Sequence, residues 1–220
     1  MGWGEILQKP NVIIFDWDNT LVDTWYTIHD ALNKTLEHFG HSLWELEDFK
    51  NNSHQSSKDL FPLIFKDKFQ EAILFFYQQI DQYHLSELKA LPYAEELLTF
   101  LFRKNIPIAL VSNKRSYVLK KEVEHLGWGK FFKEVIGSGD AARDKPHPDP
   151  IMLAMDRLDY CLENSCWYVG DTITDWIAAK ASGCQPIALW TNPDNFDKKL
   201  EFAVPHIKSC YELYLKISSF

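Results

Sequence analysis

The stretch Val12-Ile13-Ile14-Phe15-Asp16-Trp17-Asp18-Asn19-Thr20-Leu21 decides how this chain is organised. Its first four residues are apolar and mostly β-branched, which predicts a short strand buried on both faces. Two aspartates separated by one residue follow at once. Carboxylates are unfavourable in strands and costly to bury, so such a pair needs a compensating positive charge. Open α/β sheets bind ligands at the carboxyl ends of their strands, so the stretch predicts a site for a divalent cation or a positively charged ligand.

The composition is that of an ordinary globular protein. The 220 residues suffice for one large domain or for a core with a smaller insert, and 46% are apolar and 25% charged. A net charge of −8 disfavours nucleic acid and anionic membranes as partners, while a local cation still allows a small phosphorylated substrate. The N-terminus lacks a signal-peptide pattern, and no stretch approaches the ~18 apolar residues of a membrane span. The four cysteines (Cys161, Cys166, Cys184, Cys210) lack zinc spacing, so we expect reduced thiols in a cytoplasmic protein.

After the first strand, residues 24–88 carry mostly helical patterns. Apolar residues recur at helical spacing from Ile28 to Phe39. They recur again from Phe69 to Ile80 within a predicted helix of residues 65–84, and residues 43–49 form a weaker amphipathic piece. The polar run from residue 51 to residue 58 predicts a loop. Because the whole segment is too long for a connection, we expect a helical cap of residues 22–90, inserted into a core of residues 1–21 and 91–220.

The second half of the chain alternates strands with helices. Strands are predicted at residues 106–111, 135–137, 166–170 and 186–190, and helices at residues 94–103, 116–126, 150–158, 174–182 and 209–217. This alternation implies right-handed crossovers. The predicted fold is therefore α/β, a doubly wound parallel sheet with a Rossmann-like core and helices on both faces.

Polar residues follow three of the predicted strands. They are Asp16 and Asp18, then Ser112 and Asn113, then Asp171 with Asp175 one helical turn later. Since the carboxyl ends of parallel strands share one edge of the sheet, we expect these side chains to converge there. Lys145 lies in a separate loop, Arg143-Asp144-Lys145-Pro146-His147-Pro148. Several carboxylates with a hydroxyl, an amide and one lysine favour Mg²⁺, bound through oxygen ligands, beside an oxyanion.

With these residues the chain resembles the haloacid dehalogenase superfamily of phosphotransferases, in particular the phosphoglycolate-phosphatase-like group with a helical cap after the first strand. Four ordered motifs carry the resemblance over nearly the whole chain: Asp16-Trp17-Asp18-Asn19-Thr20-Leu21-Val22-Asp23-Thr24, Val111-Ser112-Asn113, Lys145-Pro146-His147-Pro148-Asp149-Pro150 and Gly170-Asp171-Thr172-Ile173-Thr174-Asp175. Each motif alone occurs by chance, whereas all four in order are specific. Asn19 stands where many members have glycine, and asparagine tolerates a left-handed turn.

The resemblance implies a Mg²⁺-dependent phosphatase that hydrolyses a small phosphate monoester through an aspartyl-phosphate. Asp16 would be the nucleophile, and Asp18 would act as general acid and then as general base. Mg²⁺ would be held by Asp16, the backbone carbonyl of Asp18, and Asp171. Asp175 would support the metal or position Lys145, a further catalytic residue.

The resemblance assigns phosphate binding to a second group of residues. Ser112 and the backbone of Asn113 would donate hydrogen bonds to phosphoryl oxygens, and Lys145 would balance their charge. Thr20 is also expected among the phosphate-binding residues, with a part in orienting Asp18 or closing the turn. The partner implied is a small phosphorylated metabolite, and its identity would be set in the loop of residues 51–58.

Other interpretations compete with this one. Asp175 could be an ordinary acid in the first turn of a helix, Ser112 and Asn113 could cap a helix, and Lys145 could be a solvated loop lysine. A phosphomutase or a pyrophosphate-cleaving enzyme would use the same fold. A catalytically idle interaction protein is also conceivable, but such a protein has no need for buried like charges. Whether the protein is a monomer or a homodimer is left open.

Overall fold

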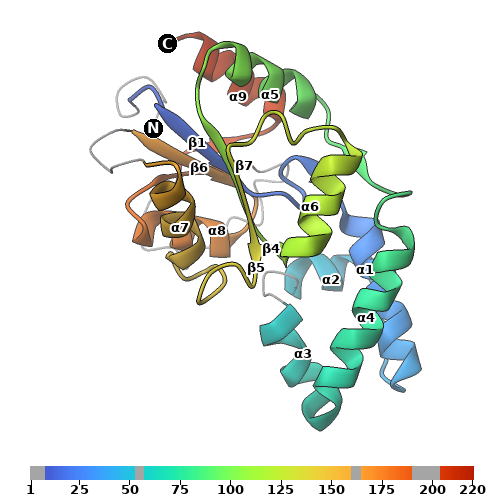
Figure 1. Ribbon diagram of the computed structural model, residues 1–220. Helices are drawn as coiled ribbons and strands as arrows, with labels where there is room; N and C mark the ends of the chain where they lie inside the picture. Colours follow the sequence, from blue (N-terminus) through green and yellow to red (C-terminus); the bar gives the residue numbers. More distant parts are fainter. Residues whose placement is uncertain (1–7, 53–56, 160–164, 190–203) are drawn as a thin grey trace. The chain divides into compact units, whose positions relative to one another are not determined.

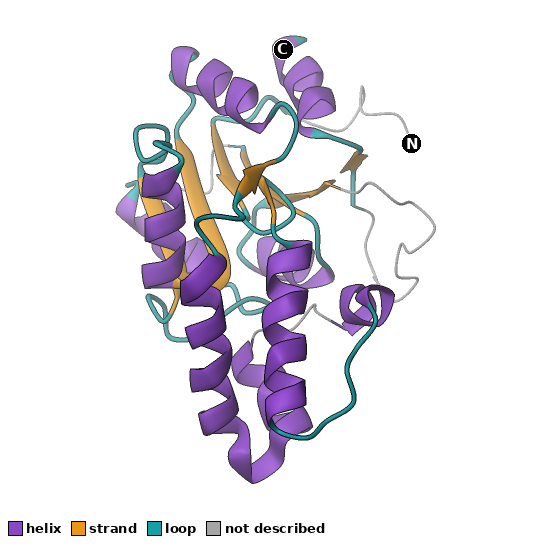
Figure 2. Cartoon of the chain, turned by 90° about the vertical axis from the view of Figure 1, so that its right-hand side faces the viewer, coloured by secondary structure: helices purple, strands orange, loops and turns teal. Residues whose placement is uncertain are grey.

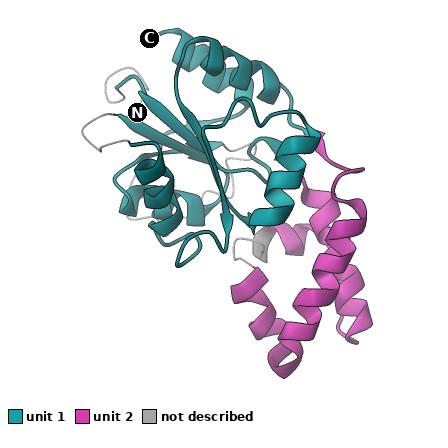
Figure 3. Cartoon of the chain, in the orientation of Figure 1, with its two compact units in different colours: residues 1–22, 90–220 teal, residues 23–89 magenta. Residues whose placement is uncertain are grey.

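The structure, a computed structural model, describes residues 8–52, 57–159, 165–189 and 204–220. The chain divides into two compact units, one of residues 1–22 and 90–220 and the other of residues 23–89 (Figure 3). It passes from one unit to the other at two short strands, β2 (Val22–Asp23) and β3 (Lys89–Ala90), which pair with each other. The helical segment therefore leaves the first unit and returns to it at a single two-stranded sheet.

Within the described residues, the first unit is built on a six-stranded sheet with the strand order β5-β4-β1-β6-β7-β8. The strands are β1 (Val12–Phe15), β4 (Ile108–Arg115), β5 (Glu134–Ser138), β6 (Cys166–Gly170), β7 (Gln185–Leu189) and β8 (His206–Ile207). Every neighbouring pair is parallel, and β1 lies between β4 and β6. All four residues of β1 are at most 1% exposed, as a strand covered on both faces requires.

Helices cover both faces of this sheet, which confirms the predicted doubly wound α/β fold (Figure 1). On one face, Val12 and Ile14 of β1 share an apolar cluster with α7 (Asp149–Arg157) and α8 (Ile173–Ala181). On the other face, α5 (Ala94–Arg103) and α9 (Cys210–Ser218) lie side by side, and Trp167 of β6 meets Phe220 edge to face at 6.0 Å. Helix α6 (Ser116–His125) connects β4 to β5.

Strand β4 is longer than the sequence indicates. It continues to Arg115, so Ser112 and Asn113 lie inside the strand and not beyond its end. Its pairing with β5 shifts register between Val111 and Arg115. At such an irregularity, polar residues stay in extended backbone although apolar and polar residues no longer alternate. The sequence pattern therefore does not mark these residues as part of the strand. Strand β8 was not predicted because two residues carry no periodic pattern, and Trp190, expected to end β7, lies outside the described residues.

The second unit is helical, as predicted, and its long helices are visible in Figure 2. Its elements are α1 (Trp25–His38), α2 (Leu46–Asn52), α3 (Ser57–Phe65), a 3₁₀ turn η2 (Lys66–Lys68) and α4 (Phe69–Tyr83). Helices α1 and α4 pack together along the buried stripes that the helical spacing predicts, with Leu32 and Leu36 on α1 and Phe76 and Ile80 on α4. Phe61 of α3 contacts the ring of Phe76 at 5.2 Å.

Two predictions for the second unit were wrong. The polar run of residues 51–58 is helical at both ends, since α2 ends at Asn52 and α3 begins at Ser57, while residues 53–56 lie outside the described part. The sequence does not predict α3, because the segment contains polar residues and the helix-breaking Pro62. In the folded chain, burial of Phe61 and Phe65 stabilises the helix. The helix expected from residue 65 begins only at residue 69, because the 3₁₀ turn intervenes.

The three cysteines in the described part of the chain, Cys166, Cys184 and Cys210, are buried free thiols. The sulfur atoms of Cys166 and Cys184 lie 3.0 Å apart beneath α7 and α8. Cys161 lies outside the described residues. No helix among the described residues combines the length and the apolar character needed to cross a bilayer.

Candidate active site

Three segments that are distant in the sequence meet at the carboxyl edge of the parallel sheet. Asp16 directly follows β1, and its backbone N–H donates to the carbonyl of Val169 in β6 at 2.9 Å. Asp171 directly follows β6, and Asp175 lies in the first turn of α8. Lys145 comes from the loop between β5 and α7. The structure therefore brings these four side chains together at the edge where open α/β sheets bind their ligands.

The Lys145 ammonium lies at the centre of this group. Its Nζ is 2.7 Å from Asp16 Oδ1 and 2.6 Å from Asp175 Oδ1, and it also reaches Tyr168 Oη at 2.8 Å and the carbonyl of Val111 at 3.1 Å. The side chain is only 2% exposed. Burial by itself lowers the pKa of Lys145, but the charges of Asp16 and Asp175 outweigh burial and raise this pKa. Lys145 is therefore a buried cation, not a solvated loop lysine.

Asn113 holds the loop that carries Lys145. Its Nδ2 donates to the backbone carbonyl of Lys145 at 2.8 Å, and its Oδ1 accepts from the backbone N–H of Lys145 at 2.9 Å. Ser112 is buried, and its Oγ accepts from the N–H of Lys114 at 3.2 Å. Neither residue caps a helix, because α6 begins at Ser116 with Arg115 in the N-cap position.

Asp175 uses both of its carboxyl oxygens. Oδ1 binds Lys145, while Oδ2 accepts from the backbone N–H and the hydroxyl of Thr172 at 2.9 and 2.6 Å, which closes a capping box. The residue is thus both a first-turn acid of α8 and a partner of the buried lysine. A Cβ at Gly170 would lie 2.6 Å from the Cβ of Asp175, so only glycine allows this close approach.

Asp16, Asp171 and Asp175 form a compact cluster of buried acids. Each offers a carboxylate oxygen, and these oxygens lie within 4.8 Å of one another. Burial raises the pKa of Asp16 to about 7 against the opposing charge of Lys145. Burial also raises the pKa of Asp171 well above its usual range, and the negative charge of Asp16 adds to this shift. Excess negative charge on oxygen ligands suits a hard divalent cation, so the residues of this cluster fit Mg²⁺.

Two predicted site residues have partners other than those expected. Thr20 is fully buried, and its hydroxyl donates to Asp171 Oδ1 at 3.2 Å. This hydrogen bond joins the turn after β1 to the residue that follows β6. The Asp18 side chain forms an ion pair with a second lysine, Lys114, whose Nζ is 2.7 Å from Asp18 Oδ1. Asn19 has a φ of +58°, which confirms the left-handed turn.

Three residues that contact the site were missed in the sequence. Lys114 and Glu122 form an ion pair beside Asp18, and the Tyr168 hydroxyl contacts Lys145. Each left a weak signal: a tyrosine in the otherwise apolar strand β6, a lysine directly after Asn113, and a glutamate on the apolar stripe of α6. Such signals identify a buried polar group but not its partner.

The acid cluster predicts how stability depends on pH. In EDTA, we expect the thermal midpoint to fall as the pH rises from 5.5 to 8. The folded-state pKa values of Asp16 and Asp171 lie above their unfolded values, so the stability they contribute when protonated is lost as pH rises through the folded pKa. The raised pKa of Lys145 changes stability only above this pH window. The lowered pKa values of Asp140 and Asp149 change stability only below it.

Differential scanning fluorimetry in EDTA and in Mg²⁺ checks this pH dependence. Mg²⁺ binds the ionised carboxylates, so it should stabilise the protein most at pH 8. The matched control is the double variant Asp16→Asn/Asp171→Asn. In EDTA, its thermal midpoint should decrease less between pH 5.5 and 8 than that of the wild type. A wild-type midpoint that stays constant across the window in EDTA contradicts the prediction.

The fold and the site define a class of protein: a doubly wound α/β protein with a helical insert after its first strand and a buried acid–lysine site at the carboxyl edge of its sheet. The chain belongs to the haloacid dehalogenase-like hydrolase family, whose pattern matches residues 13–189.

Named relatives are similar to this chain to different extents. Pyrophosphatase PpaX of Oceanobacillus iheyensis is 29% identical over 183 residues, 83% of this chain and 85% of that protein. Phosphoglycolate phosphatase of Escherichia coli is 34% identical over 116 residues, 53% of this chain and only 45% of that protein. A crystal structure of a hydrolase of the same superfamily from Ehrlichia chaffeensis has a TM-score of 0.68 and 27% identity, over 97% of this chain and 98% of that one.

Proposed function

We propose that this protein is a Mg²⁺-dependent phosphatase that hydrolyses a small phosphate monoester through an aspartyl-phosphate on Asp16. The observation that carries the proposal is the buried contact of Lys145 with Asp16 and Asp175, next to Asp171, at the ligand-binding edge of the sheet. Buried charges of this kind are costly, and they are typical of sites that bind a cation and an anion together. The names of two relatives, a phosphatase and a pyrophosphatase, support phosphate chemistry.

Asp16 is the nucleophile in this proposal. Lys145 binds its Oδ1 at 2.7 Å, which fixes the carboxylate while Oδ2 attacks phosphorus. Asp18 donates a proton to the leaving oxygen and later takes one from the water that hydrolyses the aspartyl-phosphate. The side chain of Asp18 is 20% exposed, against 8% for Asp16, which suits a group that exchanges protons with substrate and water.

Asp16, Asp171 and the backbone carbonyl of Asp18 hold Mg²⁺ in this proposal. When bound, the cation offsets the repulsion between a dianionic phosphate and an anionic nucleophile. Both oxygens of Asp175 already accept hydrogen bonds, so we assign Asp175 mainly to holding Lys145 and only secondarily to the metal. Thr20 holds Asp171 by its hydroxyl and is reassigned from phosphate binding to this positioning role.

Lys145, the Ser112 hydroxyl and the backbone N–H of Asn113 bind the phosphoryl oxygens. The Ser112 oxygen accepts from the N–H of Lys114, so its own proton can be donated. The Asn113 side chain serves the same site indirectly, because it fixes the backbone of Lys145 by two hydrogen bonds. These donors balance the charge that spreads over the phosphoryl group during transfer.

The helical unit of residues 23–89 serves as a cap in this proposal, with limits one residue inside those expected from the sequence. Opening admits the substrate, and closure excludes bulk water from the aspartyl-phosphate. We assign substrate specificity to residues 51–58, the segment that the sequence predicted as a loop.

A second candidate is the cleavage of pyrophosphate by the same residues. It is favoured by one observation, the 29% identity to a protein named pyrophosphatase over 83% of this chain. A phosphomutase would need the aspartyl-phosphate to persist until it is returned to a substrate, and no feature of the acid cluster favours that over hydrolysis.

Phosphate release from 4-nitrophenyl phosphate, 2-phosphoglycolate and pyrophosphate tests the proposal. We expect release from a monoester in Mg²⁺ and a loss of at least about 100-fold in EDTA. Release from pyrophosphate alone would favour the second candidate. No release from any compound, by folded protein whose thermal midpoint rises with Mg²⁺, would refute the hydrolase role and favour an interaction protein.

A further inference from the structure

A second buried ion pair lies beside Asp18, outside the acid cluster. Lys114 Nζ is 2.7 Å from Asp18 Oδ1 and donates to both carboxyl oxygens of Glu122 at 2.9 and 2.7 Å. The side chains of Lys114 and Glu122 are 8% and 1% exposed. The lysine thus joins β4 to α6 on one side and to the turn after β1 on the other.

Trp17 closes this network. Its indole Nε1 donates to Glu122 Oε2 at 2.6 Å, and its ring, which is fully buried, meets Trp128 edge to face at 5.8 Å. Trp17 stands between Asp16 and Asp18 in the chain, so the contacts run from Trp17 through Glu122 and Lys114 back to Asp18. A closed set of contacts of this kind fixes both the backbone and the side chain of Asp18.

Stability alone does not account for the pair of Lys114 and Glu122. Glu122 shares the buried side of α6 with Val118, Leu119 and Val123. An apolar pair of similar volume would avoid the desolvation of two charges at such a position.

We propose that Lys114, held by Glu122, is a positioning residue for Asp18 in the phosphatase reaction; the inference rests on the proposed function. Lys114 Nζ lies 2.7 Å from Oδ1 of Asp18. In this proposal, the other carboxyl oxygen, Oδ2, carries the proton for the leaving group. In the first step, the bond from Asp16 to phosphorus forms, the bond from phosphorus to the leaving oxygen breaks, and that oxygen receives the proton of Asp18. The ammonium then holds the Asp18 carboxylate in place for the attack of water.

The test compares two aryl esters that differ in their need for a proton. Phenolate leaves poorly unless it is protonated, whereas 4-nitrophenolate leaves without a proton, so only the first ester depends strongly on the general acid. The quantity to measure is kcat/KM in Mg²⁺, because it reports the steps up to the aspartyl-phosphate. For Lys114→Met we expect kcat/KM to fall about 100-fold for phenyl phosphate and less than about 10-fold for 4-nitrophenyl phosphate.

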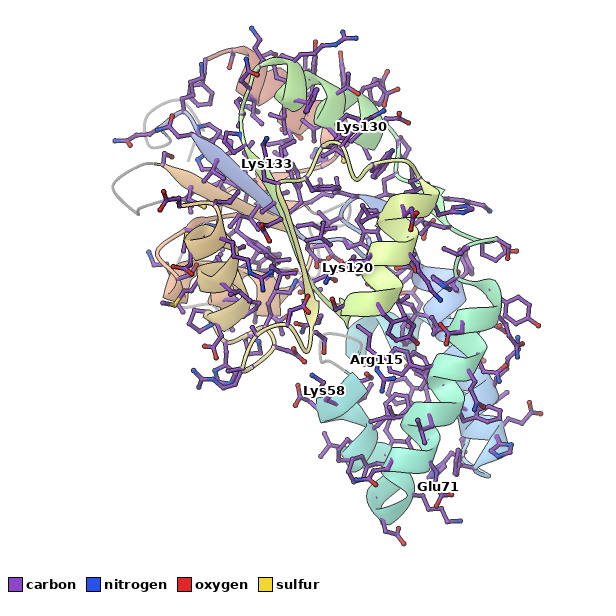
Figure 4. The ribbon with its side chains drawn as sticks, in the orientation of Figure 1. Lys58, Glu71, Arg115, Lys120, Lys130 and Lys133 are labelled. Carbon is purple, nitrogen blue, oxygen red and sulfur yellow. The ribbon has the colours of Figure 1, made fainter. Side chains whose placement is uncertain are left out.

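A double variant, an Asp18→Asn background and a matched control make the test specific. Lys114→Met leaves the Glu122 carboxylate buried beside the indole, so Lys114→Met/Glu122→Gln is measured with it; the neutral amide keeps a hydrogen bond to Trp17 and protects folding. In an Asp18→Asn background, Lys114→Met should cause no further difference between the two esters, because its effect passes through Asp18. Lys120→Met is the matched control: Lys120 lies on α6 (Figure 4) with a side chain 54% exposed, and its loss should change neither rate.

The outcomes separate the inference from the function on which it rests. A selective loss with phenyl phosphate in Lys114→Met or in the double variant supports the positioning role. Equal losses for the two esters, with active wild-type protein, overturn the positioning role alone and make Lys114 a structural residue. Wild-type protein that releases phosphate from neither these esters nor the wider panel overturns the proposed function, and the inference with it.

Discussion

The substitution Asp16→Asn is expected to abolish Mg²⁺-dependent phosphate release and, at the same time, to stabilise the metal-free protein at pH 8. An amide cannot attack phosphorus, so turnover should fall by about 10⁴-fold or more. The amide oxygen can still accept from Lys145, while one negative charge leaves a cluster in which burial raises the pKa of Asp16 to about 7. We expect a gain of roughly 2 kcal/mol, or about 5 °C in the thermal midpoint.

Phosphate release in Mg²⁺ and thermal unfolding in EDTA check the two halves of this prediction separately. The matched control is Asp30→Asn, which removes a carboxylate that is 59% exposed and paired with Lys34 in the helical unit. It should leave both quantities close to those of the wild type. Turnover that survives Asp16→Asn would show that another group attacks phosphorus. A lower thermal midpoint for this variant would show that the buried acids are already balanced by Lys145.

The substitution Lys145→Met is expected to remove both activity and stability. Phosphate release should fall by at least about 10³-fold, because the phosphoryl oxygens lose their cation and Asp16 loses its anchor. The unfolding free energy in EDTA should fall by about 3–5 kcal/mol, since three buried carboxylates remain without a counter-charge. Mg²⁺ should restore more stability to this variant than it adds to the wild type.

Urea unfolding in EDTA and in Mg²⁺ measures these changes. The informative companion is Lys145→Met/Asp175→Asn, which removes one charge of each sign from an ion pair of 2.6 Å. This double variant should recover part of the lost stability but none of the activity, because the phosphate would still lack its cation. If Lys145→Met is as stable as the wild type in EDTA, the buried carboxylates are neutral when the lysine is absent. The prediction that they need Lys145 as a counter-charge would then be wrong.

Local sequence patterns correctly predicted the bounds of those elements whose apolar residues can be buried in only one way. The strands β1 and β6 and the helix α5 have the predicted bounds, because a short apolar run flanked by polar residues or a regular helical stripe leaves little choice. The helix α3 was missed because its stability comes from Phe61 and Phe65 packing in the helical unit, which outweighs the unfavourable Pro62. The extension of β4 was missed because its register shift follows from pairing with β5.

The strand pattern of the chain was enough to predict that the acids at the strand ends meet. Parallel strands place Asp16 and Asp171 at one edge of the sheet, because right-handed crossovers leave few topologies for the alternating elements. Lys145 was predicted to join them only from the resemblance of its loop to a family motif. The contacts that each side chain makes at this edge became known only from the packing of the folded chain. Thr20 binds Asp171, Asp175 is shared between Thr172 and Lys145, and Asp18 pairs with Lys114. Such partners depend on strand register and on side-chain rotamers across elements far apart in the chain, and no local pattern records either.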